Sequence, residues 1–352
     1  MDLQHQRKYY IDIVRALAIC FVVALHTGQR VPICNKYIGI FLIQGVPLFL
    51  LISGGLIMAK AEELSISQFF KKYYKRLVQF AILIPICGIT TNALVWFCMG
   101  SDISLSMANG IKSLPELMNV GQISFGDALV KAVTTANGVY PSTLNMGNSH
   151  TWYLYLIISL YILTPFMAQS TKNASRKEIL LLFLFIFVAT RGHFAFIEKL
   201  TTPFNIDYLT LFFMGYLIIS KNFIPKGTLF SKIIIIGETI CIFAYLGKNH
   251  ISFVNNMLFQ DVCLFILPVA ILLFLRDYCD KLYCKLIRSL SDCSFGIYLW
   301  HFSFLWLISI FFPQASVNPY LRYCIFFSCS LGAPWILTLI LKKYKWTRWL
   351  VS

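Results

Sequence analysis

Ionisable side chains within an apolar stretch are the first feature of this sequence that could do chemistry. The stretch "RKYYIDIVRALAICFVVALHTG", residues 7–28, contains Asp12, Arg15 and His26. Arg15 and His26 are eleven residues apart, almost three helical turns, so they share one face of a helix and lie about 16 Å apart along its axis. An imidazole titrates near neutral pH and is therefore suited to general acid–base chemistry.

A charged residue at membrane depth needs compensation. Its insertion costs at least about 2.5–3.5 kcal/mol, so it normally faces the interior of a helix bundle or a wet cavity. Asp12 precedes Arg15 by about one turn and is placed to pair with it, which lowers that cost. We therefore expect a functional site, with Asp12 and Arg15 at one end and His26 at the other. The alternative is a structural ion pair and a hydrogen-bonded interfacial histidine.

Two further stretches combine small or basic residues with apolar ones. "GVPLFLLISGGLI", residues 45–57, places Ser53 beside two glycines, and small residues permit close backbone approach between helices. "FFKKYYKRL", residues 69–77, contains a basic cluster that suits phosphate groups, with lipid headgroups as an equal alternative. The cluster consists of Lys71, Lys72, Lys75 and Arg76.

Two more apolar stretches, "SHTWYLYLIISLYILTPF" and "SFGIYLWHFSF", each carry a histidine. The first begins with His150 and Trp152, and in the second His301 follows Tyr298 by one turn. An interfacial Trp ordinarily belongs to the aromatic belt, and a lone membrane histidine is most often a hydrogen-bonded core residue. Three histidines together with Arg15 favour a shared site.

The composition indicates a membrane protein. Of the 352 residues, 58% are hydrophobic and only 13% are charged, and the mean hydropathy is +0.71. Soluble domains carry roughly a quarter charged residues. The apolar runs approach the ~20 residues that a helix needs to cross a bilayer. We predict one all-α polytopic domain over residues 1–352, with ten spans at 10–28, 38–58, 77–99, 152–170, 178–195, 205–220, 231–247, 257–275, 293–312 and 320–341.

The net charge is +15, and the basic residues are distributed along the chain as in membrane proteins. Of the 30 Lys and Arg residues, 21 fall at the N-terminus, in four alternate connections and in the C-terminal tail, which predicts cytoplasmic N- and C-termini. We expect membrane lipids or a phosphate-bearing ligand as partners, and no nucleic acid. The eleven cysteines form no paired C-x-x-C pattern, so no metal site is expected.

In this order, the stretches resemble the acyltransferase 3 family of bacterial inner-membrane proteins. Arg15 and His26 match the family's motif of Arg, ten residues, then His, within the "YIDIVRALAI" consensus region. "PLFLLISGGLI" resembles the second-span signature, "HTWYLYLIISLYILTPF" is similar to the H-L-W-F-L pattern, and "SFGIYLWH" is similar to the late S-x-x-I-Y-x-x-H pattern. The chain looks closest to enterobacterial-type surface-polysaccharide O-acetyltransferases that lack a fused hydrolase-like domain.

One position departs from the family's pattern. The family has an Arg-x-x-Arg pair at the start of the third span. Arg76 matches the second arginine, and Tyr73 stands at the position of the first. The neighbouring Lys72 and Lys75 offer a point charge without the bidentate fork of an arginine.

The resemblance implies transfer of an acetyl group from cytoplasmic acetyl-CoA, a co-substrate rather than a bound cofactor, to a polymeric or lipid-linked glycan such as O-antigen or lipopolysaccharide. It implies that Arg15, Ser53 and the basic cluster contact the donor, with Asp12 at the same end. His26 then acts as general base on the acceptor hydroxyl, or carries the acetyl group itself. The residues expected to contact the acceptor or shape the cavity are His150, Trp152, Tyr298 and His301.

Two other functions fit the same polar groups. An exporter or carrier of polysaccharide or lipid-linked sugar would line its pathway with them. A membrane sensor or assembly scaffold would tolerate the loss of His26. An exporter predicts altered surface delivery of a polymer whose acetyl content is unchanged. An enzyme predicts loss of base-labile acetyl groups from a polymer that is still present.

Overall fold

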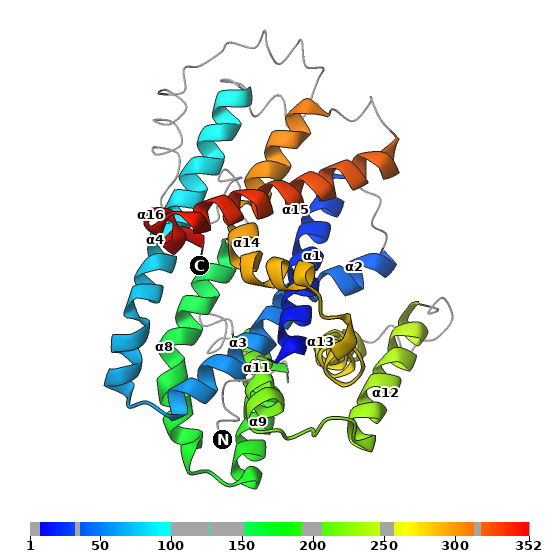
Figure 1. Ribbon diagram of the computed structural model, residues 1–352. Coiled ribbons are helices and arrows are strands. Elements are labelled where there is room, and N and C mark those ends of the chain that lie inside the picture. Colours follow the sequence, from blue (N-terminus) through cyan, green and yellow to red (C-terminus); the bar gives the residue numbers. More distant parts are fainter. Residues whose placement is uncertain are drawn as a thin grey trace. The chain divides into compact units, whose positions relative to one another are not determined.

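The computed structural model describes residues 8–31, 36–99, 126, 151–191, 206–246, 257–312 and 318–351. Within these residues every regular element is a helix, which confirms the predicted all-α class (Figure 1). In chain order the helices are α1 (Tyr9–Arg30), α2 (Lys36–Leu42), α3 (Gly45–Glu62), α4 (Ile66–Met99), α8 (Trp152–Lys172), α9 (Arg176–Arg191), α11 (Ile206–Gly215), the π-helix η3 (Tyr216–Ser220), α12 (Leu229–Leu246), α13 (Met257–Tyr278), the short 3-10 helix η5 (Asp280–Leu282), α14 (Lys285–Phe311), α15 (Pro319–Lys343) and α16 (Lys345–Val351).

Each predicted span coincides with at least one of these helices. Among the described residues, four segments are long and apolar enough to cross a membrane: Tyr9–Gln29, Ile38–Glu62, Trp152–Lys172 and Pro319–Lys343. The number of ten spans and the cytoplasmic position of both termini remain predictions.

Two helices begin at places that the hydropathy did not indicate. Within the predicted span 38–58 the helix is interrupted, and α3 starts afresh at Gly45. Pro47 explains the interruption, because a proline has no N–H and its ring collides with the carbonyl of the residue four positions earlier, here Ile43. Helix α4 begins at Ile66, well before the predicted residue 77.

A capping box sets the start of α4. The amide of Ser65 donates to Gln68 Oε1 over 2.9 Å, and the amide of Gln68 donates to Ser65 Oγ over 3.3 Å. The same reciprocal pair, Ser175 with Glu178, opens α9. These side chains satisfy amides that the first helical turn leaves without partners. The sequence pattern S-x-x-[EQ] therefore carries the local information that a hydropathy average omits.

The backbone divides into two compact units. Unit 1 consists of Met1–Ala18, Ile43–Tyr74 and Ser159–Ser291, and unit 2 of Ile19–Leu42, Lys75–Ile158 and Asp292–Ser352. The prediction of one domain over the whole chain stays a prediction.

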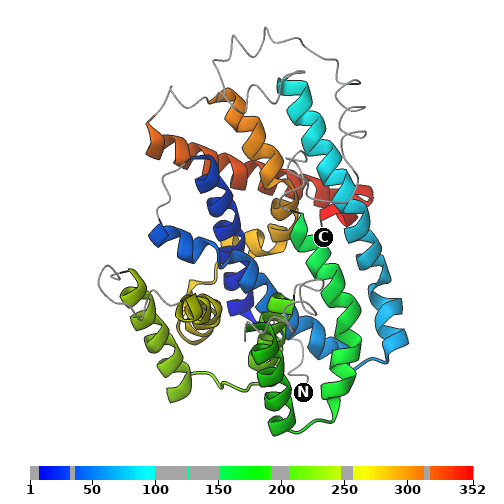
Figure 2. The ribbon, with the colours of Figure 1, turned by 180° about the vertical axis from the view of Figure 1, so that it is seen from behind.

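Glycines hold α3 and α11 together in unit 1. A Cβ at Gly54 would lie 1.7 Å from the carbonyl oxygen of Phe212, and a Cβ at Gly215 would lie 1.8 Å from that of Leu51. Both positions are therefore closed to any side chain, because the two backbones touch there. Helices α3 and α11 lie next to each other in both views (Figures 1 and 2). The small residues predicted to pack helices in the "SGG" stretch do so at Gly54.

The π-helix η3 of unit 1 is stabilised by charged side chains. The hydroxyl of Tyr216 donates to Glu62 Oε1 over 2.5 Å, and the amine of Lys221 forms an ion pair with the same oxygen at 2.8 Å. The amine of Lys8 donates to the carbonyl of Ile219 over 3.2 Å. A single widened turn of this kind needs such partners, because it breaks the regular ladder of backbone hydrogen bonds.

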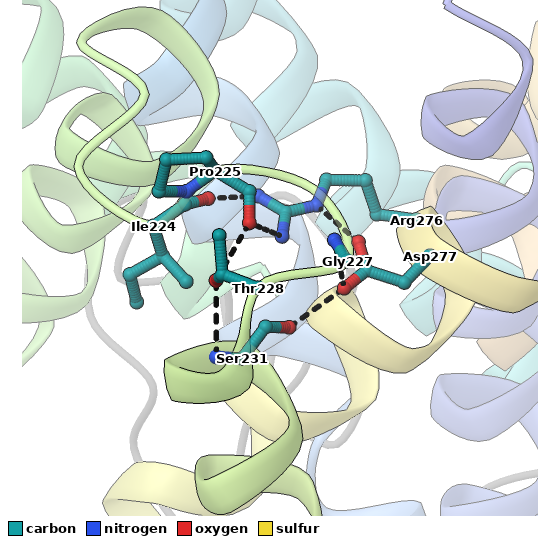
Figure 3. A network of polar contacts seen from close by, with 7 residues as sticks. All are labelled: Ile224, Pro225, Gly227, Thr228, Ser231, Arg276 and Asp277. Atoms are coloured by element: carbon teal, nitrogen blue, oxygen red, sulfur yellow. Dashed lines mark hydrogen bonds and ion pairs between the residues drawn. The ribbon is translucent and has the colours of Figure 1, made fainter.

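A polar network ties the connection between η3 and α12 to the end of α13, also within unit 1 (Figure 3). Arg276 donates from Nη1 to the carbonyl of Ile224 over 2.6 Å and from Nε to Asp277 Oδ1 over 2.8 Å. Asp277 Oδ2 accepts from the amide of Gly227 over 3.0 Å and from the hydroxyl of Ser231 over 2.7 Å. Both charges of the pair are thus compensated by hydrogen bonds.

Unit 2 has an apolar core shared by α14 and α15. A Cβ at Gly296 would lie 2.3 Å from Thr338 Oγ1, so α14 and α15 approach closely. The hydroxyls of Thr91 and Ser303 are 2.7 Å apart and join α4 to α14. One buried cluster of this unit contains Val31, Phe302, Leu305, Trp306, Ile308 and Phe326.

Candidate active site

His26 and His301 lie side by side in unit 2. The centroids of the two imidazole rings are 5.3 Å apart, with the ring planes inclined by 37°. His26 and Phe302 pack edge to face, with their ring centroids 5.5 Å apart. Helix α1 supplies His26 and helix α14 supplies His301, so two separate motifs of the sequence meet in one place.

Hydrogen bonds set the proton position on both rings. His26 Nδ1 lies 3.0 Å from Gln29 Oε1, one turn later on α1. His301 Nδ1 lies 2.7 Å from the carbonyl oxygen of Tyr298. Both partners are acceptors, so in each ring Nδ1 carries the proton and donates it. The lone pair of each neutral imidazole is then on Nε2, the arrangement that a general base requires.

The two histidines differ in accessibility. His26 is half-buried, whereas His301 is 0% exposed. A reacting hydroxyl must come within hydrogen-bond reach of its base. His26 is therefore the more accessible histidine of the pair, and His301 packs behind it.

Two tyrosines complete the surroundings of His301. Tyr298 is 4% exposed, and its ring centroid lies 5.9 Å from that of His301. Tyr153, from the start of α8, meets Tyr298 edge to face at 5.4 Å. Trp152 is half-buried, and its ring lies 6.4 Å from the ring of Tyr153. Tyr298 and His301, which were predicted to share one site, thus lie next to each other. Tyr153 contacts Tyr298 on one side and Trp152 on the other.

Arg76 is held between aromatic rings in unit 2. Its guanidinium carbon lies 4.6 Å from the ring centroid of Phe80 and 4.7 Å from that of Phe295. Its Nη1 donates to Gln79 Oε1 over 2.9 Å, and the amide nitrogen of Gln79 donates to the carbonyl of Trp349. Stacking and hydrogen bonding fix the plane of the guanidinium. Helix α16, which carries Trp349, thereby contributes to the position of Arg76.

The other predicted donor-site residues are spread over unit 1, apart from Lys75, which is exposed on the part of α4 in unit 2. Asp12 is 3% exposed, and its Oδ1 accepts from the hydroxyl of Ser291 over 2.8 Å. Arg15 on α1 and Ser53 on α3 are half-buried, and Lys71 and Lys72 on α4 are exposed.

Tyr73, which stands at the position of the family's first arginine, lies in an aromatic cluster of unit 1. Its ring centroid is 4.5 Å from that of Phe69 and 5.6 Å from that of Tyr161. Lys72 places its amine 5.9 Å from the Tyr73 ring. The tyrosine therefore packs as an aromatic residue with a cation beside it.

His150 lies outside the described residues. In the part of the chain that the structure describes, no group of three or more His, Cys, Asp or Glu side chains is arranged to hold a metal ion.

Three residues of the site were not singled out from the sequence. Gln29 follows His26 at helical spacing, so its contact could have been inferred from that spacing alone. Tyr153 and Phe302 adjoin predicted residues, but an aromatic residue in a membrane helix is ordinarily a packing residue. Only the meeting of α1 with α14 distinguishes Phe302 from the other phenylalanines.

A family profile described as an acyltransferase domain, that of the acyltransferase 3 family, matches residues 8–339. No curated protein and no solved structure gives a significant match. The matched region contains the histidine pair, the tyrosines and Arg76. Because the match covers nearly the whole chain, the protein belongs to the acyltransferase 3 family and is a membrane acyltransferase.

Proposed function

We propose that the protein is an acetyl-CoA-dependent O-acetyltransferase of the bacterial inner membrane, which modifies a sugar hydroxyl of a surface polysaccharide such as O-antigen or lipopolysaccharide. The observation that supports it best is the pair of His26 and His301, 5.3 Å apart, with His26 accessible and bonded through Nδ1 to Gln29. This is the geometry of a general base oriented by a second group.

In the proposed reaction, His26 Nε2 takes the proton of the sugar hydroxyl. The oxygen attacks the carbonyl carbon of the acetyl thioester, forming a C–O bond, and the C–S bond breaks. The thiolate of CoA leaves and takes up the proton from His26. Gln29 keeps the ring in one orientation throughout, because its oxygen accepts from Nδ1–H in the neutral and in the protonated imidazole.

A covalent variant uses the same nitrogen. His26 Nε2 attacks the thioester first, the C–S bond breaks, and CoA leaves as the thiolate. The sugar oxygen then attacks the acetyl carbon, the bond to Nε2 breaks, and the hydroxyl proton passes to solvent, from which the thiolate takes up a proton. The two routes differ in a measurable property. Only the covalent route leaves labelled acetyl on the protein when acetyl-CoA is supplied without an acceptor.

On the donor side, the stacked guanidinium of Arg76 suits a phosphate group of CoA, and Lys75 beside it adds a positive charge. Arg15 and Ser53 stay proposed donor contacts because they lie in the family's motifs, and Lys71 and Lys72 because they belong to the basic cluster. Residues proposed for the acceptor or the cavity are His150, Trp152, Tyr298 and His301.

The test is mass spectrometry of the surface glycan from cells that carry the wild-type gene, no gene, or His26→Ala at matched expression. We expect an acetyl increment on one sugar in the wild type and its loss in the other two strains. An exporter would instead change the amount of polymer at the surface and leave its acetyl content as it was. Normal acetylation by His26→Ala would rule out the proposed mechanism.

A further inference from the structure

Arg322 lies on the buried face of α15. The buried residues of this helix recur every four positions, at Arg322, Phe326, Ser330, Pro334 and Thr338, so they form one stripe. Arg322 is 6% exposed, whereas its neighbour Tyr320 is 70% exposed and Leu321 is 55% exposed. An arginine that only reaches for the membrane surface would extend from the exposed side of the helix. Arg322 points into the packed side.

The charge of Arg322 has no counterpart among the described residues. Its guanidinium carbon lies 4.9 Å from the ring centroid of Phe326, and Nε is buried with no hydrogen-bond partner. A guanidinium stays protonated in proteins, and a buried unpaired charge is strongly unfavourable. An ionisable residue in a membrane helix is a candidate for function for this reason. Its fork of donors matches a carboxylate or a phosphate.

The place of Arg322 relates it to the histidine pair of unit 2. Phe326, beneath its guanidinium, belongs to the same buried cluster as Phe302, which meets the ring of His26. On the next residue of α15, the hydroxyl of Tyr323 donates to the carbonyl of Ala24 over 3.1 Å. Ala24 precedes His26 by two residues on α1. Arg322 therefore packs on the buried cluster that reaches His26 through Phe302, and its neighbour Tyr323 bonds α15 to α1 two residues before His26.

Helix α14 separates the surroundings of Arg76 from those of Arg322. Phe295, which stacks on Arg76, precedes His301 by six residues on this helix. Trp306, which belongs to the buried cluster beside Arg322, follows His301 by five residues. Phe295 and Trp306 are thus about 16 Å apart along the axis, with His301 between them. If Arg76 contacts the donor, Arg322 lies on the opposite side of the histidines.

We propose that Arg322 binds an anionic group of the acceptor, so that the preferred substrate carries a carboxylate or a phosphate near the hydroxyl that is acylated. This inference rests on the proposed acyl transfer to a sugar and adds the chemical class of the acceptor. The anion comes either from an acidic sugar or from the phosphate of a lipid carrier, and both present the same oxygens to the guanidinium.

The experiment uses the full chain in phospholipid nanodiscs, labelled acetyl-CoA and two pairs of acceptors. The first pair is a disaccharide with a uronic acid and the same disaccharide with the carboxylate reduced to the alcohol. The second pair is a neutral sugar on a polyprenyl phosphate and the same sugar on a polyprenyl ether. The variants are Arg322→Met and Arg322→Lys. The control is Lys343→Met, which removes an exposed cation from the same helix.

The readout is the ratio of kcat/KM for the charged acceptor to that for its neutral partner. We expect Arg322→Met to lower this ratio about 10- to 100-fold in one pair, Arg322→Lys to lower it less, and Lys343→Met to leave it unchanged. A fall in the first pair identifies a sugar carboxylate, and a fall in the second identifies a carrier phosphate. An equal loss for charged and neutral acceptors in both pairs would overturn the inference and leave the acyl transfer standing. Absence of transfer to every acceptor by the wild type would overturn both.

The melting midpoint of Arg322→Met separates recognition from packing. Among the described residues the charge has no ion-pair partner, and methionine keeps an apolar contact with Phe326, so the substitution should keep or raise the midpoint. A lower midpoint together with an unchanged acceptor ratio would assign Arg322 a purely structural part and contradict the inference.

Discussion

The two neighbouring histidines are expected to contribute unequally to catalysis. His26 is accessible and acts on the substrate in the proposed reaction, while His301 is fully buried behind it. His26→Ala should lower the rate of acetyl transfer by about 10²–10⁴-fold, the usual effect of losing a positioned acid–base group. His301→Ala should cost less, because it removes a packing partner of the base. Single-turnover assays at matched protein amounts compare the two, and an equal or larger loss for His301→Ala would reverse their roles.

Asp277 is expected to make stability depend on pH. Burial by itself raises the pKa of this carboxyl. Hydrogen bonds from Arg276, Ser231 and Gly227 together lower the pKa by more than burial raises it, so it lies below its ordinary value. A carboxyl with a lowered pKa stabilises the fold above its unfolded pKa, and this contribution is lost as the pH falls through the folded pKa. Asp277→Asn should therefore melt at a lower temperature than wild type at pH 7, with the difference shrinking as the pH approaches 3.

The control for Asp277→Asn is Glu63→Gln, which neutralises an exposed carboxyl of the same unit. It should leave the melting midpoint nearly unchanged at both pH values. A midpoint for Asp277→Asn that equals wild type at pH 7 would contradict the stabilising part of the network in Figure 3.

The candidate site could be predicted from the sequence at its ionisable residues and less well at its apolar ones. His26 and His301 were recognisable because a polar group within an apolar run is unusual. Phe302 and Tyr153 were not, because aromatic residues are common in such runs and their position depends on which helices meet. Arg322 was counted only as one more basic residue, since the sequence does not reveal which face of α15 is buried.

At the scale of elements, the contact of α3 with α11 is sensitive to one methyl group. Gly54→Ala should destabilise the protein by about 1–3 kcal/mol or more, because the added carbon would overlap the Phe212 carbonyl oxygen. Gly237→Ala on α12 is the matched control, since nothing lies within 4 Å of its added Cβ. There alanine should be neutral or stabilising by up to about 1 kcal/mol. Thermal unfolding in detergent compares the two, and equal midpoints would refute the close approach.

Helix α16 is expected to tune donor binding through Gln79. Gln79→Leu removes the acceptor for Arg76 and the donor to the Trp349 carbonyl. We expect the KM for acetyl-CoA to rise about 3- to 10-fold with kcat little changed, because the guanidinium is less well oriented. Gln79→Glu keeps an acceptor for Arg76 and should retain most of the affinity. A change in kcat with a constant KM would argue against a positioning part in donor binding.

Helix boundaries were predictable only where short-range chemistry sets them. Ser65 with Gln68 and Ser175 with Glu178 form capping boxes that are visible in the sequence and mark the true starts of α4 and α9. Pro47 likewise marks the interruption before α3. The π-helix η3 has no such local sign, since it depends on Glu62, which lies far from it in the chain.

At the scale of the whole molecule, the distribution of 30 basic residues predicts the orientation in the membrane. In a variant without its native cysteines, Cys introduced at Asn173, between α8 and α9, should react with an impermeant reagent only after the inner membrane is opened. Cys introduced at Asn318, before α15, should react in intact cells. Both positions are exposed. The opposite pattern would invert the predicted topology.

The order of residues along α14 has a kinetic consequence. Arg76 stacks on Phe295 of α14, and the buried cluster beside Arg322 includes Trp306 of the same helix. His301 lies between these two positions. Under the proposed function the two substrates then enter from different directions and do not exclude one another. A non-reactive analogue of acetyl-CoA should therefore inhibit the reaction without competing with the sugar for its binding site. Raising the sugar concentration should then not relieve the inhibition.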